Sequence, residues 1–327
     1  MGQPSETFDT YDAKGIREDL QDVIYSITPD DTPFYSACAK TKATNTLHEW
    51  QTDTLRDSAD NAHIEGDDTA GNAVTATVRL NNYTQIFKNA VVVSDTTYGV
   101  KSAGRKEEMA YQMLKVAREQ KLDIEKALFA NQASVSGNAS TPRRLGGLGA
   151  WMKTNVNFQT GGSPSSGANP TGDANGNADG TDARTDNSTT TDFDQDKFDA
   201  VMQSIWESGG NPDRVYLSAF QMDKALGFTG NNSQRSTVQA GDEKVVKSLA
   251  VYVTPWGTVE FVPSRENRSR DVYIIQNDMF ATPVLRPTKS IELAKTGDAT
   301  TRQVTTELTL CVKNEKSSGL IADNSTS

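Results

Sequence analysis

The chain contains two histidines, His48 and His63, so any chemistry that needs an imidazole must use one of them. Both lie in a stretch rich in Thr, Asn and Asp, and neither belongs to an HExxH motif or another metal-binding spacing. A Ser/His/Asp triad or a Cys/His pair would need the same two residues. We interpret both as exposed or half-packed polar residues, and we predict that the chain is not an enzyme and has no catalytic residues.

Motifs for phosphates and nucleophiles are also missing from the sequence. There is no GxxxxGK[ST] loop and no GxSxG elbow. Gly146-Gly147-Leu148-Gly149 is too short for a dinucleotide fingerprint and follows no convincing strand. We therefore predict a turn at these glycines and no bound cofactor.

One polar loop resembles a calcium site. Asn175, Asn177 and Asp179 are followed by Gly180, and Asp186 stands at loop position twelve, as in an EF-hand. The loop departs from that pattern at its first, eighth and twelfth positions and has no flanking helices. A Gly/Asn/Asp-rich loop produces such spacings by chance, so we predict no metal and keep these four side chains as the only calcium candidate.

Composition limits the class of protein. The 327-residue chain has a net charge of −10, which argues against direct nucleic-acid binding because that binding needs Lys and Arg on phosphate. No apolar run reaches the roughly 18 residues of a membrane span, and the first residues lack the features of a signal peptide. Two cysteines, Cys38 and Cys311, are too few for a disulfide framework. We expect a reducing cytoplasm and no membrane partner.

The N-terminal part of the chain consists of pieces that cannot form a core alone. Residues 1–45 predict an extended arm with one short helix around Ile16 to Ile27, which Pro29 and Pro33 end. Residues 46–93 predict a β excursion: a strand from Thr46 to Gln51, an acidic loop, and two strands joined at Asn81-Asn82. Alternation at Val74, Ala76, Val78 and Leu80 marks one buried face. We expect this excursion to find few partners in its own chain.

Four residues of the excursion are candidates for contacts between subunits. An isolated hairpin is only marginally stable in water, so its apolar face must pack on something. Interfaces also favour tryptophan over most other residues. The candidates for burial against a neighbouring subunit are Trp50, Val74, Val78 and Leu80.

The rest of the chain predicts an α+β fold. In residues 94–158 the apolar spacing predicts a long helix from Ala103 to Gln132. Residues 193–270 predict helices and strands, including a helix from Asp194 to Glu207 and a strand from Arg214 to Leu217. Residues 271–327 predict closing strands, the first from Val272 to Ile275.

Between Gln159 and Asp192 the chain has no large apolar residue. It consists mostly of Gly, Ser, Thr, Asn and Asp, a composition typical of flexible segments. We predict a surface-facing polar insertion that does not belong to the core and that neighbouring subunits hold in place.

The order of these pieces resembles major capsid proteins of tailed bacteriophages of the Hong Kong 97 (HK97) type, whose N-arm, E-loop, spine helix, A-domain and P-domain follow in this order. Ile27-Thr-Pro-Asp-Asp-Thr-Pro-Phe34 is similar to the opening of a podovirus-type major head protein family that was long catalogued as a domain of unknown function. The closing stretches Asp271-Val-Tyr-Ile-Ile, Val284-Leu-Arg-Pro287, Leu293-Ala-Lys-Thr-Gly-Asp298 and Glu307-Leu-Thr-Leu-Cys-Val-Lys-Asn-Glu315 resemble the same family. The insertion departs from it.

The resemblance implies a shell subunit with the HK97 fold. Many copies, as hexamers and pentamers, would form an icosahedral virion capsid that encloses double-stranded DNA without sequence-specific binding. Scaffolding, portal and cement proteins are possible further partners, and the host bacterial cytoplasm is the expected place of assembly. Two alternatives stay open: an encapsulin-like compartment shell with a protein cargo, and a secreted adhesive or carbohydrate-binding β protein.

Overall fold

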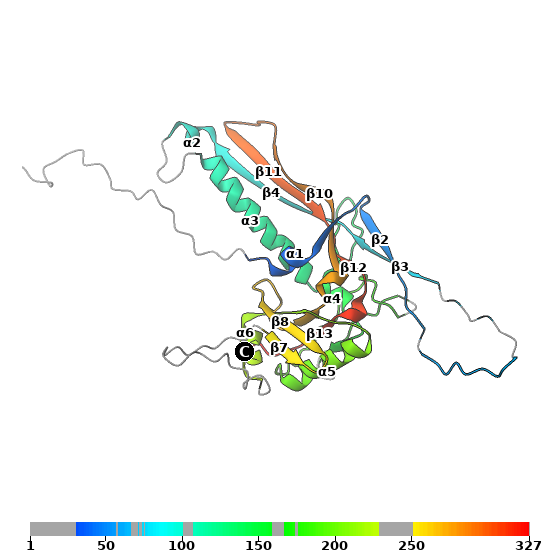
Figure 1. Cartoon of the computed structure of the whole chain (residues 1–327). Coiled ribbons are helices and arrows are strands. Elements are labelled where there is room, and N and C mark those ends of the chain that lie inside the picture. The colour runs from blue at the N-terminus through cyan, green and yellow to red at the C-terminus, as the bar shows by residue number, and fades with distance from the viewer. Residues whose placement is uncertain are drawn as a thin grey trace, which may run out of the picture.

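The computed structural model describes residues 31–56, 58–66, 71, 74, 76–100, 107–158, 167–173, 176–228 and 251–326. Two β-sheets, a separate pair of strands, one long helix and several shorter helices make up this part of the chain (Figure 1). The helix predicted around Ile16 to Ile27 lies outside the described residues. None of the described helices has the length and apolarity needed to cross a membrane.

The first sheet lies beside the long helix, α3, in an elongated part of the molecule (Figure 1). Its strand order is β1-β10-β11-β4, and β12 also pairs with β10. The strands are β1 Ala39–Lys42, β4 Gln85–Ser94, β10 Phe280–Glu292, β11 Ala299–Leu308 and β12 Cys311–Val312. A short helix, α2 (Asp95–Gly99), follows β4. β4 and β11 are antiparallel over their full lengths, from Ala299↔Ser94 to Leu308↔Gln85.

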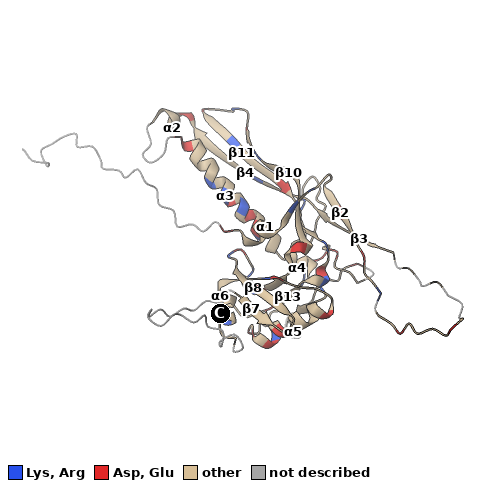
Figure 2. Cartoon of the chain, in the orientation of Figure 1, with Lys and Arg blue, Asp and Glu red and all other residues tan. Residues whose placement is uncertain are grey.

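The helix predicted from Ala103 to Gln132 is confirmed as α3, Glu108–Phe129. Its 22 residues span about 33 Å at about 1.5 Å per residue. Met109, Ile124 and Leu128 are buried on one side, as the apolar spacing predicts. The opposite side carries acidic and basic residues in mixed order (Figure 2), with Lys115 and Glu119 paired at 3.7 Å. The mixed charges keep the exposed side solvated.

The second sheet has the order β5-β13-β9-β6-β8-β7. Its strands are β5 Val156–Asn157, β6 Arg214–Leu217, β7 Val251–Thr254, β8 Gly257–Pro263, β9 Val272–Ile275 and β13 Gly319–Ile321. Helices α5 (Gln195–Glu207) and α6 (Ala219–Ala225) pack apolar side chains against it, in a cluster centred on Phe198. The predicted helix from Asp194 and the predicted strands Arg214 to Leu217 and Val272 to Ile275 are confirmed as α5, β6 and β9. The Asp194 carboxylate caps α5 by accepting a hydrogen bond from Lys197 N at 2.9 Å.

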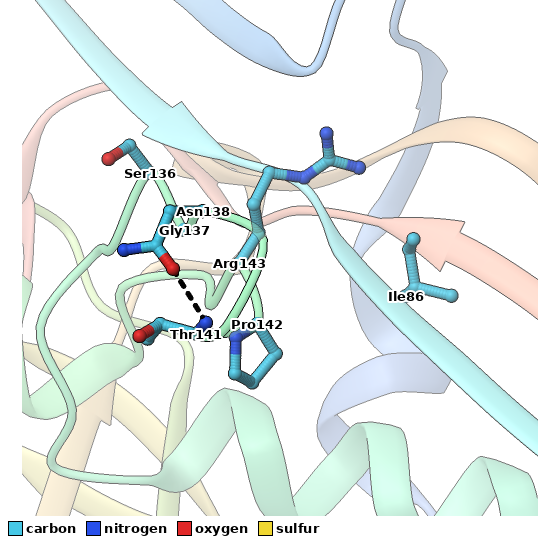
Figure 3. A pocket seen from close by; sticks show the side chains of 7 residues that line it. All are labelled: Ile86, Ser136, Gly137, Asn138, Thr141, Pro142 and Arg143. Carbon is cyan, nitrogen blue, oxygen red and sulfur yellow. Dashed lines mark hydrogen bonds between the residues drawn. The ribbon is translucent and has the colours of Figure 1, made fainter.

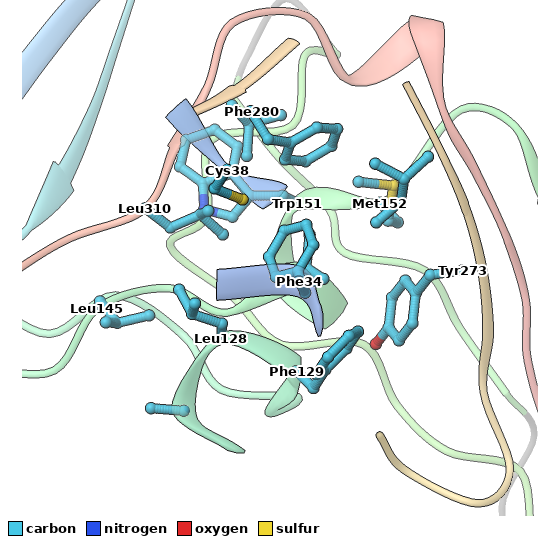
Figure 4. Close-up of a cluster of buried hydrophobic side chains, with 14 of the residues drawn as sticks. Phe34, Cys38, Leu128, Phe129, Leu145, Trp151, Met152, Tyr273, Phe280 and Leu310 are labelled. Carbon is cyan, nitrogen blue, oxygen red and sulfur yellow. The ribbon is translucent and has the colours of Figure 1, made fainter. Parts of the chain in front are cut away.

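A large apolar cluster joins the two sheets (Figure 4). Phe34, Phe129, Trp151, Tyr273 and Phe280 are fully buried in it and come from five separate segments. Trp151 ends the short helix α4 (Leu148–Trp151). The turn predicted at Gly146 to Gly149 is wrong, because Leu148 and Gly149 belong to this helix. The 3-10 turns η2 (Asn277–Met279) and η3 (Glu315–Ser317) complete the elements. Both sheets therefore contribute to this cluster, and the second sheet also has its own cluster around Phe198.

The predicted hairpin at Asn81-Asn82 is wrong. β2 (Leu47–Thr52) pairs with β3 (Val78–Tyr83), and the two asparagines lie inside β3 instead of in a turn. β4 begins at Gln85, two residues after the end of β3, and pairs with β11 of the first sheet. The strand predicted from Val74 begins only at Val78. The chain therefore changes sheet at the position where a turn was expected.

A short helix that was not predicted from the sequence, α1 (Pro33–Ala37), begins at Pro33. The helix that Pro29 and Pro33 were expected to end lies outside the described residues. Proline fits the first turn of a helix because the amide that it lacks would have no partner there. Phe34 follows at once and is fully buried, so the chain enters the core directly after this proline.

Candidate assembly surfaces and the buried polar framework

The loop between β2 and β3 projects far from the body of the molecule (Figure 1). Every described residue between 53 and 77 has an exposed side chain. Leu55, Ile64 and Val74 are exposed to 98%, 83% and 94%. These three apolar side chains make almost no contact in their own chain and are therefore available to another molecule. We name residues 53–77 the projecting loop.

The structure separates the four interface candidates. Leu80 is buried in the central cluster, and Trp50 and Val78 are partly buried against it. The Trp50 indole donates a hydrogen bond to Val312 O at 2.9 Å and packs on Trp151 at 5.4 Å between ring centroids. Only Val74 is free of the core. The expectation that this part of the chain lacks internal partners is wrong for β2 and β3, although it fits the projecting loop.

Leu55 and Ile64 were missed by sequence reasoning. They stand alone in an acidic stretch and take part in no periodic pattern. The only available signal is their chemical type in a segment with no other apolar partner. Isolated apolar residues in a long polar loop therefore mark contact candidates that periodicity overlooks.

Asn82 connects four parts of the chain from inside β3. Its side chain is fully buried. Its Nδ2 donates to Leu310 O at 2.7 Å and Gly146 O at 3.2 Å, and its Oδ1 accepts from Gly146 N at 2.8 Å and Ser134 Oγ at 3.0 Å. All four hydrogen-bonding positions of the amide are used. This explains why an Asn-Asn pair stands in a strand, and the sequence carries no local sign of it.

We expect Asn82→Ala to lower the free energy of unfolding by about 2 kcal/mol or more. The substitution leaves backbone groups of Gly146 and Leu310 buried without partners, at about 1–3 kcal/mol each. Urea denaturation followed by circular dichroism measures the change. Asn81→Ala is the matched control, because Asn81 is the next residue of β3 and is only half-buried. An equal loss in both variants would contradict the role of Asn82.

The segment from 167 to 192 is not a surface insertion in its described part. Ala178, Arg184 and Asn187 are buried. Gly180 packs against the Trp151 ring, where an added Cβ would lie 2.7 Å from the indole, and its φ of +70° also favours glycine. Asn131, just beyond α3, accepts from Arg184 N at 3.1 Å and donates to Arg184 O at 2.8 Å. The expectation that this segment lies outside the core is therefore wrong.

Asp323 holds this segment to the C-terminal end of the chain. Its fully buried carboxylate contacts Arg184 Nη2 at 3.1 Å and Arg270 Nη2 at 2.8 Å, and it accepts from Asn187 N at 2.9 Å. Its carbonyl accepts from Thr191 N at 3.0 Å. Asp323 is also the described non-glycine residue with a positive φ, +59°, a conformation that Asp tolerates better than most residues.

Arg268 and its two partners, Asp271 and Asp186, extend this framework of buried charges. Arg268 Nη1 contacts Asp271 Oδ2 at 2.7 Å, and its Nη2 contacts Asp186. Burial raises the pKa of Asp271 to about 6, and Arg268 acts in the opposite direction. Together with Asp323, the six charges balance: Arg184, Arg268 and Arg270 face Asp186, Asp271 and Asp323. Paired, hydrogen-bonded charges can be buried where isolated ones cannot.

The calcium candidates already have other partners. Asn177 Nδ2 donates to Asp173, Asp179 Oδ1 accepts from Thr181, and Asp186 pairs with the arginines. Asn175 lies outside the described residues. In the part of the chain that the structure describes, no three His, Cys, Asp or Glu side chains are placed to hold a metal ion.

A shallow depression of about 470 Å³ lies beside β4 (Figure 3). The residues that line it are Ile86, Ser136, Gly137, Asn138, Thr141, Pro142 and Arg143. Arg143 Nη2 contacts Glu307 Oε1 at 2.6 Å, and Asn138 Oδ1 accepts from Thr141 N at 2.8 Å. These groups satisfy one another, and no nucleophile with an adjacent base lines the depression. Of the two histidines, His48 is half-buried beside Trp50 and His63 is exposed.

Comparison with known proteins agrees with this architecture. The model of the SU10 major capsid protein family matches residues 3–325. The major capsid protein of Escherichia phage Phieco32 is 29% identical and the match covers 98% of this chain and 97% of that protein. Among solved structures, the capsid of Cyanophage A-1(L) has a TM-score of 0.65 at 12% identity, with 98% of this chain and 99% of that chain covered. An encapsulin from Synechococcus elongatus has a TM-score of 0.54 at 9% identity, with 96% and 94% covered.

The structural neighbours show the fold, and the family model shows the relationship over nearly the whole chain. The α+β prediction and the resemblance to HK97-type capsid proteins are confirmed. The chain belongs to the SU10 major capsid protein family and has the fold of phage capsid subunits.

Proposed function

We propose that copies of this major capsid protein close, as hexamers and pentamers, into an icosahedral head that encloses double-stranded DNA. The observation that carries the proposal is the projecting loop with Leu55, Ile64 and Val74 almost fully exposed. A lone subunit leaves these side chains in water, whereas a neighbouring copy in a shell can cover them. The loop then acts as the E-loop, α3 as the spine helix, and the two sheets as the P-domain and A-domain.

The charge of the chain supports enclosure of DNA without binding to it. A net charge of −10 favours repulsion from packed phosphate, so DNA would not be trapped on the inner wall. Cys38 and Cys311 are free and buried, which fits assembly in the reducing cytoplasm of a bacterial host. Scaffolding, portal and cement proteins are the candidate further partners of such a head.

Imaging of the purified chain tests the proposal. We expect size-exclusion chromatography and negative-stain microscopy to show closed particles, formed either by the chain alone or with a co-expressed scaffold. Heads isolated from infected cells should contain DNA protected from nuclease. A subunit that stays monomeric under all assembly conditions, scaffold included, would refute the proposal.

The cargo separates the proposal from its alternative. The similarity to an encapsulin keeps a cellular compartment shell as the second candidate. Particles of that kind would contain a protein cargo and no genome. Mass spectrometry of the purified particles distinguishes the two by the presence of portal and tail proteins or of an enzyme.

A further inference from the structure

Glu125 is a buried carboxylate that faces backbone amides. It lies on the inner side of α3 and is fully buried. Its Oε1 accepts from Phe34 N at 2.9 Å, and its Oε2 accepts from Tyr35 N at 2.7 Å. Among the described residues no cation is paired with it. Burial raises the pKa of Glu125 to about 7, and the two amide bonds act in the opposite direction.

The two amides belong to the first turn of α1. Pro33 has no amide hydrogen, so Phe34 and Tyr35 are the first residues of α1 that can donate. Initial helix amides have no partner within their own helix. One side chain of α3 thus satisfies both, 90 and 91 residues away in sequence.

Apolar packing places α1 against the same helix. The Phe34 ring lies 5.3 Å from Phe129, 5.4 Å from Tyr216 and 6.0 Å from Phe280, measured between centroids. This ring gives α1 its affinity for the core, but a single ring can enter a pocket in more than one orientation. The carboxylate of Glu125 selects one orientation, because its two oxygens match two successive amides.

We infer that Glu125 is a positioning residue: it fixes α1 on α3, sets the position of the chain at residue 31, and allows α1 to open as a unit when its bonds are lost. Any effect of α1 on assembly rests on the proposed function. The opening of α1 is a property of the single subunit and stands without that function.

The chain carries its own reporter of this opening. Cys38 follows α1 directly and is 4% exposed, whereas Cys311 lies in β12 and is 6% exposed. Burial, and after it the nearby Glu125 carboxylate, raises the pKa of the Cys38 thiol, and burial raises that of Cys311 to about 11. Both thiols are therefore unreactive in the closed subunit. Opening of α1 exposes Cys38 alone, and global unfolding exposes both.

Glu125→Gln is the variant that tests the inference. Glutamine keeps the shape but has one accepting oxygen, so one of the two amides loses its bond. We expect the rate at which Ellman's reagent labels Cys38 to rise about tenfold or more, with Cys311 as slow as in the wild type. Peptide mass spectrometry identifies the labelled cysteine. Glu119→Gln, an exposed change on the same helix, should leave both rates unchanged.

Two results would overturn the inference. One is a Cys38 rate in Glu125→Gln equal to that of the wild type; the other is equal acceleration of both cysteines. Glu125→Gln also removes a charge that raises the pKa of Cys38, so the wild-type subunit in urea below its unfolding transition gives an independent answer whether or not the variant folds. Cys38 must react before Cys311 there, and equal rates refute a separate opening unit. A wild-type subunit that forms no particles would refute the proposed function and leave these rates untouched.

Discussion

Asp323→Asn should be the most destabilising conservative substitution in the buried framework, lowering the free energy of unfolding by about 3–5 kcal/mol. Asparagine has nearly the same shape as aspartate and also tolerates a positive φ, so the backbone at φ +59° is not disturbed. What changes is the charge. Arg184, whose side chain is fully buried, then loses its closest anion.

Asp192, an exposed aspartate of the polar segment, gives the matched control. Asp192 contacts Lys224 Nζ at 3.4 Å, but its side chain is 66% exposed. Exposed ion pairs contribute about 0–1 kcal/mol, so Asp192→Asn should shift the urea midpoint only slightly. Equal losses in the two variants would show that the buried ion pairs of Asp323 stabilise the subunit no more than the exposed pair of Asp192 does.

The contrast between these two aspartates explains why the polar segment was misjudged. Its composition correctly indicates that no large apolar side chain can hold it in the core. Composition does not show that Arg184 finds Asp323, 139 residues further along the chain. Burial of this segment depends on matched charges and small residues such as Gly180, and neither leaves a periodic pattern.

Local patterns were sufficient where one element determines its own structure. The apolar spacing of α3 and the start of α5 at Asp194 can both be recognised from residues that are close in sequence, and both helices are confirmed. The strand β9 is a short apolar run and is confirmed as well. Asn82 shows the limit of such patterns, because its amide bonds to Gly146 and Leu310, far away in sequence, overrule the turn preference of an Asn-Asn pair.

The candidate contact surface could be predicted only in part for the same reason. Alternation along Val74 to Leu80 suggested one continuous apolar face. In the structure, Val78 and Leu80 pack against the chain's own core, while Val74 stays outside. Sequence alone cannot tell an internal partner from a neighbouring subunit, since both require the same apolar side chains.

Replacement of the projecting loop should abolish shell formation and leave the subunit folded. Thr52 and Val78 are paired at the end of the β2–β3 ladder, so an Asn-Gly turn can join these strands directly. All described side chains between 53 and 77 are exposed, and their removal leaves no cavity. The free energy of unfolding of the subunit, measured by urea denaturation, should therefore change by less than about 0.5 kcal/mol, as for surface changes generally.

A triple variant that keeps the length of the loop tests whether assembly needs the apolar side chains of the projecting loop or only a loop of this length. In Leu55→Ser, Ile64→Ser and Val74→Ser combined, each position loses the roughly 1.5–3 kcal/mol that burial of such a side chain provides. We expect the subunit concentration needed for particles, measured by light scattering, to rise at least about 100-fold. Asp53→Asn, Asp60→Asn and Glu65→Gln combined change charge in the same loop and leave these three side chains intact, so they should shift that concentration far less. Normal assembly of the triple serine variant would mean that neighbouring subunits do not bury the apolar side chains of the projecting loop.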